Sequence, residues 1–119
     1  MENGIYHIKF RSSGGDVVGN GLVVVQNGSL NGGDFGYIYR GLELTTGNII
    51  NSKIQVSRYD ASQQSLFGDL EDFDIELAGT LHNSGKEFNL SGTVIGHPQL
   101  RISVVGKKLR DLALVVRWV

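Results

Sequence analysis

The chain has no cysteine among its 119 residues and only one proline, Pro98. Without thiols it can form no disulfides, thiolate metal sites or iron–sulfur clusters, and it has no cysteine nucleophile. Charge of one sign is also scarce, because 11 basic and 12 acidic residues leave a formal net charge of −1. Such a balance gives no field that would draw the protein to nucleic acid or to an anionic membrane. We therefore expect neither as a direct partner.

Long hydrophobic segments are missing as well. The longest unbroken apolar run covers residues 112–116, far short of the ~20 residues of a membrane helix. The first residues, Met-Glu-Asn-Gly, lack the basic and apolar regions of a secretory signal. These features predict a cytoplasmic protein. The length predicts a single domain over residues 1–119, since domains typically contain about 100 to 200 residues.

Glycine is abundant, with 17 residues, and apolar and polar residues alternate along most of the chain. In the first such run, for example, Tyr6, Ile8 and Phe10 share one face. Sustained helical periodicity is almost absent, so the pattern predicts an all-β protein. The expected strands cover residues 4–11, 17–25, a short segment at Leu30, 36–44, 49–58, 72–81, 88–96, a segment around 100–104, and the tail 109–119.

About eight strands joined by short turns remove their exposed edges best by closing into an up-and-down antiparallel β-barrel. A β-sandwich is the alternative. The tail also fits a helix, although we favour a strand that closes a sheet edge or, alternatively, contacts a second copy of the chain. A barrel of this size holds one small ligand or fills with its own side chains, so the fold alone does not decide the function.

Two turn motifs stand out. Asn27 and Gly28 form a strong hairpin signal, because both accept the positive φ angles of a type I′ turn. Gly32, Gly33 and Asp34 predict a second turn, in which Gly33 has positive φ and Asp34 accepts hydrogen bonds from backbone amides. No helix follows this motif, which argues against a phosphate-binding loop.

Two arginines lie in phase with apolar residues. Arg40 alternates with Ile38 and Leu42, and Arg58 alternates with Val56, so the period of 2 places both guanidinium groups on apolar faces. They either reach the rim of the barrel or bind the acidic head of an apolar ligand inside it. The candidate residues for the lumen and its ligand are Tyr6, Phe10, Tyr39, Arg40 and Arg58.

Acidic residues gather in the second half of the chain, at Asp69, Glu71, Asp72, Asp74 and Glu76. They form either a solvated outer wall or a surface that attracts a basic protein partner. A hydrolase built on these acids is a further alternative. No serine, histidine and acid suggest a proton relay, and the three histidines lack the spacing of a metal site. We therefore predict no enzyme and no cofactor.

The run Asn27-Gly28-Ser29-Leu30-Asn31-Gly32-Gly33-Asp34, followed by Tyr39-Arg40-Gly41, resembles the GrlR family of negative regulators of bacterial type III secretion. The opening Gly4-Ile5-Tyr6 and the later Arg58-Tyr59 occur in the same order, so the resemblance extends to about Lys108. It implies a lipocalin-like barrel with an apolar interior. It also implies a homodimer that binds a partner protein rather than catalysing a reaction.

In the best-known member of that family, a run of four acidic residues is associated with the capture of a transcriptional activator. Here Thr45-Thr46-Gly47-Asn48 occupies the corresponding turn, so the binding residues of that partnership do not carry over. Two hypotheses lead from the sequence. The first is a regulatory protein with an unknown protein partner, for which a transcriptional activator is one candidate. The second is a lipocalin-type binder of a small apolar or amphipathic acidic ligand.

Overall fold

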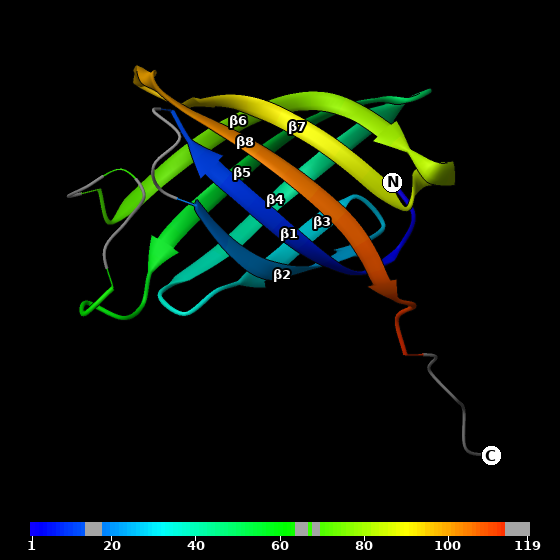
Figure 1. Ribbon diagram of the computed structural model, residues 1–119, viewed down its shortest axis with the longest axis horizontal. Coiled ribbons are helices and arrows are strands. Elements are labelled where there is room, and N and C mark those ends of the chain that lie inside the picture. The colour runs from blue at the N-terminus through cyan, green and yellow to red at the C-terminus, as the bar shows by residue number, and fades with distance from the viewer. Residues whose placement is uncertain (14–17, 64–66, 68–69, 114–119) are drawn as a thin grey trace.

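The computed structural model describes residues 1–13, 18–63, 67 and 70–113. Its strands are β1 (Gly4–Ser12), β2 (Val18–Gln26), β3 (Ser29–Gly33), β4 (Tyr37–Thr46), β5 (Ile49–Arg58), β6 (Asp72–His82), β7 (Glu87–Val94) and β8 (His97–Arg110). Consecutive strands pair antiparallel, and β8 pairs with β1 to close the barrel (Figure 1). The predicted all-β, up-and-down barrel is confirmed, and the sandwich alternative is wrong.

Alternation along the strands sorts side chains between the barrel interior and the outer wall. On β1, Tyr6 and Ile8 are buried, whereas Lys9 and Arg11 are exposed. The interior cluster draws on all eight strands: Tyr6, Ile8, Val23, Val25, Leu30, Tyr37, Ile50, Val56, Ile75, Leu77, Phe88, Leu90, Ile102 and Val104. Removal of this apolar surface from water is the main force that holds the barrel together.

The first predicted turn is confirmed. Asn27 and Gly28 connect β2 to β3 with φ angles of 50° and 84°, the sign that a type I′ turn requires at both positions. The second motif was partly misread. Gly32 and Gly33 belong to β3, and Gly33 does not have the predicted positive φ. The turn itself lies at residues 34–36.

Close strand approach explains a glycine at position 32. A Cβ atom there would lie 2.0 Å from the carbonyl oxygen of Leu22 on the neighbouring strand. Any side chain would therefore push β2 and β3 apart. The same kind of contact occurs at Gly92, where a Cβ would lie 1.7 Å from the carbonyl oxygen of Glu76. These glycines are needed for strand packing rather than for turns.

The end of the chain differs from the prediction. The turn between β7 and β8 lies at Ile95 and Gly96, and His97 already begins β8. That strand continues to Arg110, so the tail prediction holds only for residues 109 and 110. Residues 111–113 lie outside any strand, and residues 114–119 are not among those described. Within the described part of the chain, no helix is long and apolar enough to cross a bilayer.

The two ends of the barrel have different covers. At one end lie the β3–β4 loop and the β5–β6 connection, and at the opposite end lies the N-terminus (Figure 1). There the Tyr6 hydroxyl donates to the carbonyl oxygens of Glu2 and Gly85, at 2.5 and 3.0 Å. Burial raises the pKa of Tyr6 to about 12. The first residues therefore close the barrel end opposite the loops.

Candidate functional site

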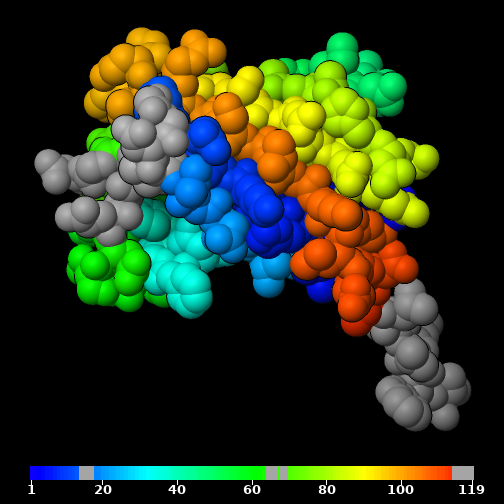
Figure 2. All heavy atoms as spheres, viewed as in Figure 1, coloured from blue at the N-terminus to red at the C-terminus, as the bar shows by residue number. Residues whose placement is uncertain are grey.

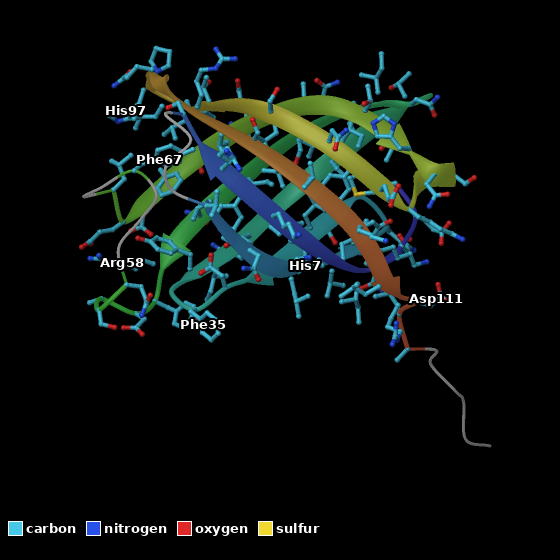
Figure 3. The ribbon with its side chains drawn as sticks, in the orientation of Figure 1. His7, Phe35, Arg58, Phe67, His97 and Asp111 are labelled. Carbon is cyan, nitrogen blue, oxygen red and sulfur yellow. The ribbon has the colours of Figure 1, made fainter. Side chains whose placement is uncertain are left out.

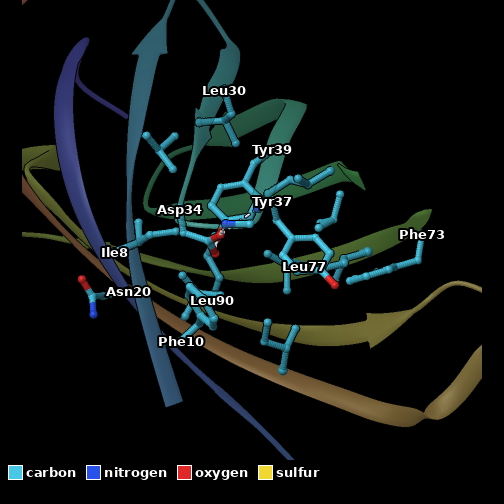
Figure 4. Close-up of a pocket in the computed structure, with 18 of the residues that line it drawn as sticks. Ile8, Phe10, Asn20, Leu30, Asp34, Tyr37, Tyr39, Phe73, Leu77 and Leu90 are labelled. Carbon is cyan, nitrogen blue, oxygen red and sulfur yellow. Dashed lines mark hydrogen bonds between the residues drawn. The ribbon is translucent and has the colours of Figure 1, made fainter. Parts of the chain in front are cut away.

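The barrel encloses a cavity of about 370 Å³, within the range of ordinary ligand pockets. Its lining is mostly apolar and aromatic and includes side chains from every strand, so the site is a product of barrel closure (Figure 4). Phe10 and Tyr39 meet edge to face across it, with ring centroids 6.4 Å apart. From outside, the side chains of β1, β7 and β8 form a continuous wall (Figure 2).

Asp34 organises the mouth of this cavity. Its Oδ1 accepts hydrogen bonds from the backbone amides of Gly36 and Tyr37, both at 2.9 Å, which confirms the predicted role. Its Oδ2 accepts the hydroxyl of Tyr39, and its carbonyl oxygen accepts that of Tyr59. One residue thus joins the β3–β4 loop to a cavity wall and to the β5–β6 connection.

Burial raises the pKa of Tyr39 well above its ordinary value of 10.0, and the hydrogen bond to Asp34 adds to the rise. The neutral phenol is favoured because a phenolate would lie in an apolar wall beside a carboxylate. Tyr39 therefore acts as a permanent hydrogen-bond donor at neutral pH. It fixes the orientation of Asp34 and leaves the carboxylate with a partner for each oxygen.

Tyr37 also lines the cavity, but its hydroxyl, unlike that of Tyr39, has no hydrogen-bond partner among the described residues. The residue is 7% exposed, and its ring lies among the side chains that surround the cavity (Figure 4). Among the described residues, no group forms a hydrogen bond with its hydroxyl oxygen. A buried, unpaired hydroxyl is unfavourable, so this oxygen marks a position where a polar partner would add stability.

Arg58 lies at the mouth rather than deep in the lumen. Its guanidinium group forms an ion pair with Glu71 and donates to the carbonyl oxygen of Gln63 at 3.2 Å. Its side chain is 19% exposed. The position at the end of β5 corresponds to the rim interpretation. Because the Arg58 guanidinium group is already paired with Glu71, it is not free to pair with an acidic ligand.

The placement of Arg40 in the lumen is wrong. It lies exposed on the outer wall and donates to the side chain of Gln55 on β5 at 2.7 Å. Its neighbours in phase, Leu42 and Leu44, are 68% and 69% exposed. The error arose because β4 is more apolar on its outer face, whereas its inner face consists of Tyr37, Tyr39, Gly41, Glu43 and Thr45.

The other lumen candidates do face inward. Tyr6 is buried, while Phe10 and Tyr39 line the cavity. Tyr6 is occupied by its two carbonyl acceptors. The structure therefore brings Phe10 and Tyr39 together at the cavity and leaves Tyr6 and Arg58 towards opposite ends.

The acidic candidates separate into two groups. Asp72, Asp74 and Glu76 are exposed in a row on the outer face of β6, which we call the β6 acidic row. Lys53 of β5 lies opposite Glu76 in the pairing of the two strands. Glu71 instead pairs with Arg58 at the mouth, and Asp69 lies outside the described residues.

The mouth exposes aromatic surface. Phe35, at the tip of the β3–β4 loop, is 88% exposed although it also lines the cavity. Figure 3 shows Phe35, Arg58 and Phe67 at one end of the barrel and Asp111 near the other. Sequence reasoning did not identify Phe35 or Tyr37 as site residues. Alternation along β4 was the available signal for Tyr37, because it shares a face with Tyr39.

Charged groups also fasten the opposite end. Lys108 pairs with Glu2 and with Asp111, the latter at 2.6 Å. The hydrogen bonds to Asp111 and Glu2 raise the pKa of Lys108 to about 12. The bond from Lys108 lowers the pKa of Asp111. The end of β8 is thus connected to the segment that precedes β1.

Comparison with known proteins gives a family and a solved structure of similar fold. A family model described as "T3SS negative regulator, GrlR" matches residues 1–112. A search of curated proteins gives no match. A similar solved structure is the isotype 1 transferrin binding protein B (TbpB) from serogroup B Neisseria meningitidis, with a TM-score of 0.53 and 12% identity. The match covers 93% of this chain but 26% of that one, and at this identity it shows the fold alone.

Proposed function

The chain belongs to the GrlR family of type III secretion negative regulators, and from this premise we propose that it lowers the activity of such a system by binding a protein partner, without catalysis. The match over residues 1–112 is the observation that carries the proposal. The near-neutral net charge adds support, because a regulator that bound DNA directly would need a basic surface.

The β6 acidic row is the surface that we assign to the partner. Asp72, Asp74 and Glu76 project from one rigid strand into solvent, and charge of one sign on a fixed surface steers a basic partner. The turn after β4 has no acidic residue at positions 45–48. A transcriptional activator remains a candidate partner, and on this chain it would meet β6 rather than that turn.

Charge reversal tests this assignment. Asp74→Lys inverts the charge at the centre of the row, whereas Glu87→Lys on β7 makes the same change away from it. We expect wild-type protein and the Glu87→Lys control to capture the same partner from cells that express a type III secretion system. Asp74→Lys should capture several-fold less, with a weaker dependence on salt. Equal capture by both variants would remove the row from the account, and capture of no protein would contradict partner binding itself.

We also propose a homodimer. Leu22 on β2 and Ile38, Leu42 and Leu44 on β4 are exposed apolar side chains, which we call the outer apolar strip; Arg40 lies between Ile38 and Leu42 on the same face of β4. In the strand pairing, Gly33 lies between Leu22 and Ile38, so that no side chain separates the two on the wall. Exposed apolar side chains grouped on one side of a barrel are typical of an interface, and a second copy of the chain can cover them through a two-fold axis.

A second function, ligand binding inside the barrel, is favoured by the cavity. Its volume of about 370 Å³ and its apolar lining suit a small hydrophobic molecule. The two functions are compatible, because the cavity opens at the loop end while the β6 acidic row lies on the wall. A small molecule in the cavity would therefore leave the β6 acidic row free for a protein partner.

A further inference from the structure

We propose that the cavity selects a neutral, largely apolar molecule with one hydrogen-bond-accepting oxygen, such as a ketone or ester carbonyl, and that the Tyr37 hydroxyl donates to this oxygen. The inference rests on the second function above and specifies the chemical class of the ligand.

The apolar requirement comes from the walls. Phe73, Leu77 and Leu90 contribute from β6 and β7, and Ile8 and Phe10 contribute from β1 (Figure 4). These side chains offer no hydrogen bonds, so most of a ligand must be hydrocarbon or aromatic. A second polar group placed against these walls would be buried without a partner, since the other polar side chains of the lining, Asn20, Asp34, Tyr39 and Gln63, belong to β2, β4 and the loops.

The single acceptor follows from Tyr37. Its hydroxyl is the buried side-chain polar atom that has no hydrogen-bond partner among the described residues. Because the oxygen is closed to water, the proposal requires the Tyr37 side chain to shift at its Cα–Cβ bond when a ligand enters. An oxygen on the ligand then satisfies a donor that the protein leaves unpaired, whereas a hydrocarbon of the same shape does not.

Neutrality follows from the charges around the cavity. The charged side chain in the described lining is Asp34, a carboxylate, which would repel an anionic ligand. Arg58 is already paired with Glu71. At the other end, the Met1 amino group donates to Thr45 at 3.2 Å, and the Thr45 hydroxyl donates to Glu43. Arg58 thus has an anionic partner directly, and the Met1 amino group is connected to the Glu43 carboxylate through the Thr45 hydroxyl.

Three compounds of similar size separate these requirements: butyrophenone (a ketone), butylbenzene (a hydrocarbon) and 4-phenylbutyrate (an anion). Each is titrated at pH 7.5 against the full chain loaded with the fluorescent probe N-phenyl-1-naphthylamine. We expect butyrophenone to displace the probe at about a five- to tenfold lower concentration than the other two compounds. A difference in affinity of this size corresponds to one additional hydrogen bond.

Tyr37→Phe keeps the ring and removes only an unpaired oxygen, so it should fold as the wild type does. It should bring butyrophenone to within about twofold of butylbenzene without changing butylbenzene itself. Ser103→Ala, which loses an exposed hydroxyl on the outer face of β8 and outside the cavity lining, is the control and should keep the wild-type order.

The outcomes distinguish the inference from the function beneath it. Equal displacement by ketone and hydrocarbon, or an unchanged preference in Tyr37→Phe, would overturn the role of Tyr37. Strongest displacement by 4-phenylbutyrate would overturn the neutrality of the ligand. Failure of the protein to bind the probe or any of the three compounds would remove ligand binding altogether.

Discussion

At the scale of single residues, Asp34 and its neighbours determine the shape of the cavity mouth. Asp34 receives two backbone amides and the Tyr39 hydroxyl through its carboxylate. Hydrogen bonds to a charged acceptor are stronger than those between neutral groups. This group of bonds holds the β3–β4 loop over the cavity and keeps Tyr39 against the wall.

Tyr39→Phe should lower the free energy of unfolding by roughly 1–2 kcal/mol near neutral pH, because it removes one hydrogen bond to a carboxylate that keeps its amide donors. The pKa of Tyr39 is higher in the folded protein than its ordinary 10.0. The advantage of Tyr39 over phenylalanine is thus fully present below pH 10 and decreases as pH rises above 10, where the unfolded chain ionises first. Urea unfolding at pH 8 and at pH 10.5 measures both effects. A difference that grows with pH would contradict the assignment.

The sequence predicted part of this site. Asp34 was recognised from its turn chemistry, and Phe10 and Tyr39 were recognised as inward residues. Tyr37 and Phe35 were missed, since an unpaired hydroxyl and an exposed ring at a mouth depend on contacts between strands distant in the sequence. The prediction for Arg40 is wrong because Arg40 shares the more apolar face of β4, and that face points outward in the closed barrel.

At the scale of elements, β4 is unusual because its outer face is the more apolar one. Ile38, Leu42 and Leu44 point outward, while Glu43 and Thr45 share the inner face with two tyrosines. Period-2 alternation gives the two faces of a strand but not which of them is buried. An apolar outer face is stabilised when a partner covers it and removes it from water.

Leu42→Lys should therefore separate the proposed dimer, because it places a charge within the outer apolar strip. Light scattering after size exclusion should give twice the chain mass of 13.0 kDa for the wild type and 13.0 kDa for the variant. Ser91→Lys adds the same charge at an exposed position on β7, which does not pair with β2, β3 or β4, and serves as the control. A wild-type mass of 13.0 kDa, or a dimer that survives in Leu42→Lys, would exclude this strip as the interface.

At the scale of the whole molecule, the barrel closes through the pairing of β1 with β8, which are separated by most of the chain. The sequence predicted this closure because a sheet of about eight alternating strands leaves no exposed edge strand when it closes into a barrel. It did not predict the length of β8, which runs from His97 to Arg110. The turn at Gly96 begins that strand earlier than the segment around residues 100–104 that the sequence predicts.

The closed barrel separates two surfaces that can work independently. The cavity is reached at the loop end, and the β6 acidic row and the outer apolar strip lie on the wall. In the proposed function, a protein partner would bind the outside of the barrel while a small molecule would occupy its inside. In this proposal, repression depends mainly on the β6 acidic row and the outer apolar strip.

The most direct test is transcription of type III secretion genes in a bacterium that carries this chain and such a system. Deletion of the chain should raise transcript levels several-fold, and wild-type protein or Glu87→Lys should restore repression, whereas Asp74→Lys should not. Unchanged transcript levels after deletion, or a fall in them, would contradict the proposal that the chain is a negative regulator.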